Sequence, residues 1–272
     1  MSSLYLYDRP GLFYFLSICT SWISWFIAAY LSHLEAYQRV SGILMLIGLV
    51  SPTVVAFTMI YVNDNLKKDL SERLFTFTAL KPFYVLLAFS IMPFSILLAQ
   101  GISLLFGYSA EQFLLSSHAS FSFSLFPAWM MLLVAPTIEE LAWHSYGTDC
   151  LRTRFSLFTT CIIFALFWVG WHFPLSFIKG YYHSNIAESS WIYSLNFAIS
   201  LFPFVFLMNW LYYKADRSII VAIIFHVTAG FFNELFATHP DSKIIQTVLL
   251  SILTLVIIYK QKHLFFNGQA QK

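Results

Sequence analysis

Residues 83–106 read FYVLLAFSIMPFSILLAQGISLLF, a run of 24 residues that contains no Asp, Glu, Lys or Arg. A helix of about 20 mostly apolar residues crosses the roughly 30 Å hydrocarbon core of a bilayer, so this run predicts a membrane-spanning helix. We therefore predict an all-α fold, a polytopic integral membrane helix bundle of about eight transmembrane helices. The seven other predicted spans are 11–31, 41–62, 124–144, 157–178, 190–213, 218–236 and 244–260.

The composition of the whole chain agrees with a membrane protein. Of its 272 residues, 59% are hydrophobic and only 10% are charged, whereas a soluble domain carries about 25% charged residues. The formal net charge of +2 is small and scattered, which argues against a nucleic-acid partner. No internal repeat or long linker divides the chain, so we predict a single transmembrane domain over residues 1–272.

The distribution of Lys and Arg predicts the orientation of the bundle, because positively charged loops stay in the cytoplasm. Alternate loops hold twelve of these residues against three in the opposite loops, Arg39, Lys179 and Lys243. This asymmetry predicts that both termini are cytoplasmic, and we expect the protein in the plasma membrane of a bacterium. The twelve are Arg9, Lys67, Lys68, Arg73, Lys81, Arg152, Arg154, Lys214, Arg217, Lys260, Lys262 and Lys272.

Ionisable side chains interrupt three predicted spans, where they are costly and usually face the bundle interior or a water-filled cavity. The fourth span ends in Glu139 and Glu140. Adjacent helical residues point about 100° apart, so one carboxylate can face a cavity while the other anchors to a neighbouring helix. Glu140 and His144 are four residues apart and share a face, where a carboxylate can hydrogen-bond an imidazole.

Two further spans contribute His172 in the fifth and His226 with Asn233 in the seventh. Together with the glutamates they form a buried Glu/His/His cluster that could bind a metal ion or hold a nucleophilic water. A lone helical His is more often a packing residue, but three such signals in three spans favour a buried site. The loops at 107–123 and 179–189, the second of which carries His183, are interpreted as solvated.

The three motifs read EELAWHSYG at 139–147, FWVGWHFPL at 167–175 and FHVTAGFFNE at 225–234. Their order and spacing resemble the CPBP intramembrane proteases, also called the CAAX protease and bacteriocin-processing family. The resemblance covers about residues 125–260, which it implies to be a CPBP-like catalytic core. It implies an intramembrane endopeptidase that cuts a hydrophobic or prenylated, CAAX-like peptide or protein in contact with membrane lipid.

The resemblance also implies roles for single residues. Glu139 would activate the attacking water, and Glu140 would orient or support it. His172 and His226 match the two essential histidines of the family. Two forms of the site stay open: a divalent metal such as zinc held by Glu139, His172 and His226, or a metal-free site in which Glu139 activates water and the histidines stabilise the oxyanion.

The chain departs from the family pattern at positions that matter for the site. His144 stands where the motif has Arg, and Ser145 follows it where Gly is usual. Gly230 stands four residues after His226, where the family often has Asn, and Asn233 is the nearest substitute. We assign His144 and Asn233 supporting roles. The alternative functions are a catalytically weakened membrane binding or bacteriocin self-immunity protein and an ion-coupled transporter.

Overall fold

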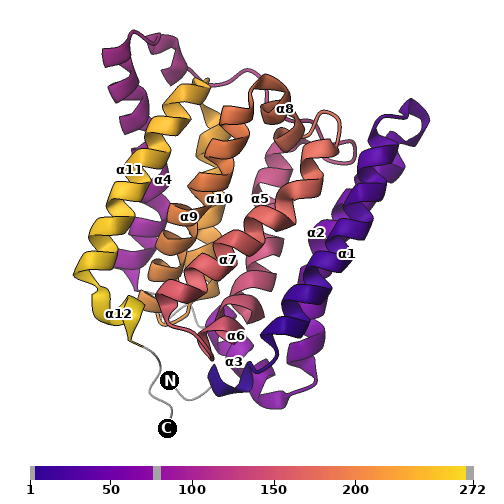
Figure 1. The fold of residues 1–272 in the computed structure, drawn as a ribbon, viewed down its shortest axis with the longest axis vertical. Helices are drawn as coiled ribbons and strands as arrows, with labels where there is room; N and C mark the ends of the chain where they lie inside the picture. Colours follow the sequence, from indigo (N-terminus) through magenta and orange to yellow (C-terminus); the bar gives the residue numbers. More distant parts are fainter. Residues whose placement is uncertain (1–3, 76–80, 268–272) are drawn as a thin grey trace.

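The computed structural model describes residues 4–75 and 81–267, so Lys272 of the charge count lies outside the described residues. Within these residues the chain is helical and has no β-strand. Each of the eight predicted spans contains a helix of the bundle (Figure 1). These helices are α1 (Pro10–Ser32), α2 (Gln38–Tyr61), α4 (Pro82–Ser103), α5 (Ala128–Ala142), α7 (Leu157–His172), α9 (Trp191–Lys214), α10 (Ile219–Leu235) and α11 (Pro240–Lys260).

Six of these helices, some with a short 3-10 helix attached, are long and apolar enough to cross a bilayer: α1, α2, α4, α7, α9 and α11. The other two are shorter, with 17 residues in α10 and 15 in α5. The lengths and apolar composition confirm a polytopic helical membrane bundle. The two short helices are two of the three elements that carry the predicted site.

The helices pack so that α10 lies in the interior and contacts α4, α5 and α9. The pair α1 and α2 packs as a hairpin on one flank, and α11 covers α4 and α9 on the other (Figure 1). Helix α2 also packs along α5, and α7 packs along α9. The three elements with ionisable side chains, α5, α7 and α10, are therefore surrounded by apolar helices.

The fourth span differs from its prediction at its end. The helix does not stop near His144 but continues through the π-helix η6 (Trp143–Gly147) and α6 (Thr148–Arg152). The predicted end of this span at residue 144 was therefore too early by eight residues. These residues are buried, Tyr146 and Cys150 among them, and burial keeps the backbone helical because unpaired amides there would be costly.

A buried ion-pair network fixes this continued helix. Arg73, on α3 (Asp64–Phe75), donates to the carbonyl oxygens of His144 at 2.6 Å and Ser145 at 2.9 Å. Its guanidinium also lies 3.2 Å from Asp149. Arg73 is only 7% exposed, so these contacts are shielded from water. Helix α3, in a segment that we predicted only as a basic loop, thus holds the turn that follows the two glutamates.

Arg217 completes the network from the turn between α9 and α10. It pairs with Asp69 at 2.9 Å and with Asp149 at 2.5 Å. Burial by itself would raise the pKa of the Asp149 carboxyl, but Arg217 and Arg73 hold that pKa below its ordinary value. Segments rich in Lys and Arg that are far apart in sequence therefore meet at one end of the bundle, where α3, α6 and α12 (Lys262–Phe266) also lie (Figure 1).

Candidate active site

Glu140 joins the fourth and seventh spans. Its Oε1 accepts a hydrogen bond from Nδ1 of His226 at 2.7 Å, and its Oε2 accepts one from Nδ1 of His144. The carboxylate and the His144 ring are fully buried. The shared face expected for Glu140 and His144 is thus observed. Because both oxygens are occupied, Glu140 is suited to fixing the orientation of the two imidazoles.

Glu139 points in a different direction, as its neighbouring position on the helix requires. Its Oε2 accepts a hydrogen bond from Nε1 of Trp168 at 3.0 Å and a longer one from Nε1 of Trp143 at 3.5 Å. These two tryptophans, which the sequence analysis did not place at the site, are the donors to this carboxylate. The sequence spacing gave some indication of this, because residues one helical turn apart share a face. Trp143 lies one turn after Glu139, and Trp168 lies one turn before His172.

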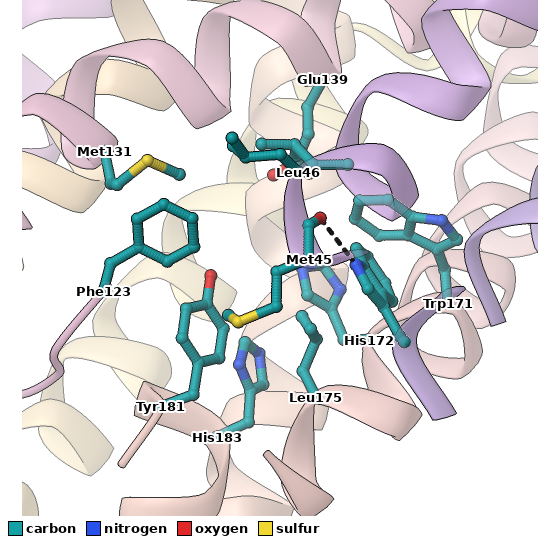
Figure 2. Close-up of a pocket in the computed structure, with 12 residues that line it drawn as sticks. Met45, Leu46, Phe123, Met131, Glu139, Trp171, His172, Leu175, Tyr181 and His183 are labelled. Carbon is teal, nitrogen blue, oxygen red and sulfur yellow. Dashed lines mark hydrogen bonds between the residues drawn. The ribbon is translucent and has the colours of Figure 1, made fainter. Parts of the chain in front are cut away.

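A cavity opens beside Glu139, between the α1–α2 hairpin and the helices α5 and α7. The volume that the centres of water molecules can occupy in it is about 50 Å³. One water needs about 10–15 Å³ by the same measure, so the cavity can hold water. Figure 2 shows Glu139 entering from one side and Tyr181, His183 and His172 from the other. The lining residues are Trp25, Met45, Leu46, Leu49, Phe123, Met131, Glu139, Trp171, His172, Leu175, Tyr181 and His183.

His172 presents one ring nitrogen to this cavity. Its Nδ1 donates to the carbonyl oxygen of Trp168 at 2.8 Å, one turn earlier on α7. A nitrogen that faces a carbonyl must carry the proton, so Nε2 of the neutral ring is unprotonated and can accept a hydrogen bond. His226 and Glu140 do not line the cavity, but His226 packs edge-on against Trp168 with ring centroids 5.2 Å apart.

The segment between α7 and α9 corrects the interpretation of residues 179–189 as a solvated loop. It contains α8 (Tyr182–Ser189), and His183 is only 7% exposed. The ring of His183 stacks on that of His172, with centroids 5.0 Å apart and planes at 24°. Neither ring nitrogen of His183 has a hydrogen-bond partner among the described residues. No sequence pattern marked this residue, because its burial depends on how α8 folds over the bundle.

The remaining candidates lie on α10. Asn233 donates from Nδ2 to the carbonyl oxygen of Ala229 at 2.9 Å, a contact within its own helix. Gly230 lies one turn after His226, and a Cβ atom there would meet Leu132 at 3.7 Å, an ordinary van der Waals contact. The helix therefore has room for a side chain at position 230, and the supporting role of Asn233 stays a prediction.

The arrangement of their donor atoms decides whether Glu139, His172 and His226 can hold a metal ion together. A catalytic zinc site uses three protein ligands and a water. In the described part of the chain, no group of three or more His, Cys, Asp or Glu side chains is placed to hold one ion. Glu140 already takes Nδ1 of His226, and Nδ1 of His172 faces a carbonyl. Glu139, His172 and His226 do not fit as a ready three-ligand set.

Comparison with known proteins decides the family. The family model described as type II CAAX prenyl endopeptidase Rce1-like matches residues 121–232. A curated relative, CAAX prenyl protease 2 of Methanococcus maripaludis, is 38% identical over 269 residues, which are 98% of this chain and 99% of the relative. The chain belongs to the CAAX prenyl protease family.

The matched region of this CAAX protease family member contains the two glutamates, His172, His183 and His226, while Asn233 lies one residue beyond it. The resemblance drawn from the three motifs is thereby confirmed. Family membership supports an intramembrane endopeptidase. Because the relative is matched along nearly its whole length, the similarity includes α1 and α2, for which the motifs gave no indication.

Proposed function

We propose that this chain is an intramembrane endopeptidase that hydrolyses a peptide bond in a prenylated, CAAX-like peptide or protein, with water activated by Glu139. The observation that carries the proposal is the cavity in which the Glu139 carboxylate and the free Nε2 of His172 face a space large enough for water. A general base must reach the proton that it abstracts within hydrogen-bond distance, directly or through one water.

The reaction proceeds in two proton transfers. Water bound between Glu139 and His172 attacks the carbonyl carbon, and its proton passes to the Glu139 carboxylate as the carbonyl π pair moves onto oxygen. Collapse of this tetrahedral intermediate re-forms the carbonyl and breaks the carbon–nitrogen bond. Glu139 then returns the proton to the departing amine. His172 Nε2 accepts a hydrogen bond from the water and orients it for attack.

The assignment of Glu140 as a supporting residue rests on its contacts. Glu140 fixes the ring of His226 through Nδ1, and that ring packs edge-on against Trp168, which donates to Glu139. His144, in place of the motif arginine, holds the other carboxylate oxygen. We therefore assign Glu140 and His144 to positioning and His226 to the stabilisation of charge.

The apolar lining of the cavity supports a hydrophobic substrate. Met45, Leu46 and Leu49 lie on α2, a helix long and apolar enough to cross a bilayer, so we expect a lipidated segment to approach from the bilayer. We further propose that both termini are cytoplasmic, because the basic segments of the chain meet at one end of the bundle. The other substrate class is a hydrophobic peptide without a prenyl group, which is to be compared with the prenylated peptide.

We also propose that the reaction needs no bound metal, because the donor atoms form no three-ligand set. Incubation of the purified protein with a strong chelator is then expected to leave cleavage unchanged, measured against a zinc endopeptidase as positive control. Loss of cleavage with the chelator, restored by added zinc, would contradict this part of the proposal.

The function is tested by incubating the purified protein with matched peptides that differ only in the prenyl group. We expect cleavage of the prenylated peptide, and its loss in both Glu139→Gln and His226→Ala while the thermal unfolding temperature is retained. Tight binding without cleavage would instead support a sequestering or immunity protein. Substrate movement across proteoliposomes without cleavage would support a transporter.

A further inference from the structure

The cavity beside Glu139 contains a histidine, His183, that no sequence motif marked. In its neutral form His172 presents an unprotonated Nε2 there, because its proton lies on Nδ1 and is donated to Trp168. The Glu139 carboxylate is an acceptor when ionised. Neither of these groups can donate to a carbonyl oxygen as the attack begins, and His226 does not line this cavity. Peptide hydrolysis nevertheless places negative charge on that oxygen.

His183 has the missing property. A neutral imidazole always carries one N–H, and neither ring nitrogen of His183 has a protein partner although both are buried. A buried polar group without a partner costs about 1–3 kcal/mol. An unpartnered nitrogen on a cavity wall is therefore available to a bound substrate or water. The ring lines the same cavity as Glu139 and points into it (Figure 2).

The ring is also held in one position, which an oxyanion donor requires. It stacks between His172, at 5.0 Å, and Tyr181, at 5.7 Å, and meets Phe197 edge-on at 4.6 Å. These contacts are made by ring faces and edges rather than through the nitrogens. The packing therefore fixes the ring and leaves its N–H available.

We propose that His183 is a catalytic residue that donates a hydrogen bond to the carbonyl oxygen of the scissile bond and to the oxyanion formed from it. The proposal rests on the proposed function, since it assigns the donor for that same hydrolysis. In the step described above, the electron pair that moves onto oxygen is stabilised by the His183 N–H, and no proton leaves His183. Tyr181 also lines the cavity and carries a hydroxyl that could donate instead, so it serves as the comparison.

The test uses His183→Phe, which keeps an aromatic ring in the stack and removes both nitrogens, and His183→Gln, which restores an N–H donor without the ring. We expect kcat of His183→Phe to fall about 100-fold, the usual loss for one oxyanion donor, with KM within about threefold of wild type. The kcat of His183→Gln should be about tenfold higher than that of His183→Phe. His263→Phe, an exposed histidine on α12, is the matched control and should behave as wild type.

Each outcome is decisive. A kcat of His183→Phe within about threefold of wild type, or a loss found in Tyr181→Phe instead, overturns the role of His183 while the proposed function stands. If His183→Phe unfolds, His183→Gln decides: activity below that of a folded His183→Ala contradicts the proposal, and activity above it supports the donor. Wild-type protein that cleaves no prenylated peptide contradicts the proposed function itself.

Discussion

At the scale of the residue, the neighbours Glu139 and Glu140 differ in what surrounds them rather than in chemistry. Glu140 has both oxygens occupied by imidazoles, whereas Glu139 is held by indole N–H groups and faces a cavity. The sequence indicated that the two must diverge, because adjacent helical residues point about 100° apart. Which one faces the cavity depends on the rotation of α5, which only the packed bundle fixes.

The indole donors provide a first prediction. Trp168→Phe removes the 3.0 Å hydrogen bond to Glu139 and should lower kcat about tenfold, because a carboxylate free to turn is less often in its reactive position. Trp143→Phe removes only the 3.5 Å contact and should have a smaller effect. Steady-state cleavage rates of the two variants check this, and an equal loss in both would argue against it.

Gly230 provides a second prediction. An Asn side chain there would lie one turn after His226 and meet only ordinary contact with Leu132, so Gly230→Asn should raise kcat several-fold by adding a donor. Gly230→Ala is the matched control: it should stabilise the helix by about 0.5–1 kcal/mol without raising kcat. An increase with Ala as large as that with Asn would show that the gain comes from helix stability alone.

At the scale of the element, the π-helix η6 links the site to the charged end of the bundle. A π turn adds a residue to the helical repeat and often occurs at functional sites. Here it begins at Trp143, three residues after Glu140, and Arg73 binds the carbonyl oxygens of His144 and Ser145 within it. We infer that α3 holds the register of His144 and so its contact with Glu140.

A third prediction follows for this contact. Arg73→Met leaves the buried Asp149 with one guanidinium fewer and should lower the free energy of unfolding by about 3 kcal/mol. Lys67→Met breaks only an exposed pair with Asp64 on the same helix and is the control, with no change in unfolding temperature expected. The same drop in both variants, measured by thermal unfolding in detergent, would contradict a special role for Arg73.

The sequence predicted the spans better than the elements between them. Long apolar runs mark a span by length alone, so α1, α4 and α9 appeared within a few residues of their bounds. The helices α3 and α8 and the π turn at Trp143–Gly147 escaped prediction because their folding depends on tertiary contacts, such as those of Arg73 and the His183 ring. For the candidate site, the sequence therefore predicted Glu139, Glu140, His172 and His226 but did not place Trp168 and His183 there.

At the scale of the whole molecule, the charged end of the bundle should make stability depend on acid. The pKa of Asp149 is lower in the folded protein than its ordinary value of 3.8. A lowered pKa contributes stability that is fully present above the unfolded value, about 3.9, and that is lost as pH falls through the folded value.

A fourth prediction is that removing the Asp149 charge destabilises the protein at neutral pH but not in acid. Asp149→Asn should unfold at a lower temperature than wild type at pH 7. The difference in unfolding temperature should narrow as pH falls below about 4, because the unfolded wild type takes up a proton there that the folded carboxylate resists. Thermal unfolding of both proteins between pH 7 and pH 3 measures this. A difference that stays constant over the whole range would show that the ionised carboxylate contributes nothing to the fold.

The central claim, that a water activated by Glu139 cuts a peptide bond inside the membrane, is tested most directly by mass spectrometry of a prenylated CAAX-type peptide. The peptide is incubated in proteoliposomes with wild-type protein or with Glu139→Gln. We predict that wild type releases the C-terminal fragment and that the variant, folded to the same extent, releases it at least about 100-fold more slowly. Equal rates in the two proteins, or no fragment from wild type, would contradict the account.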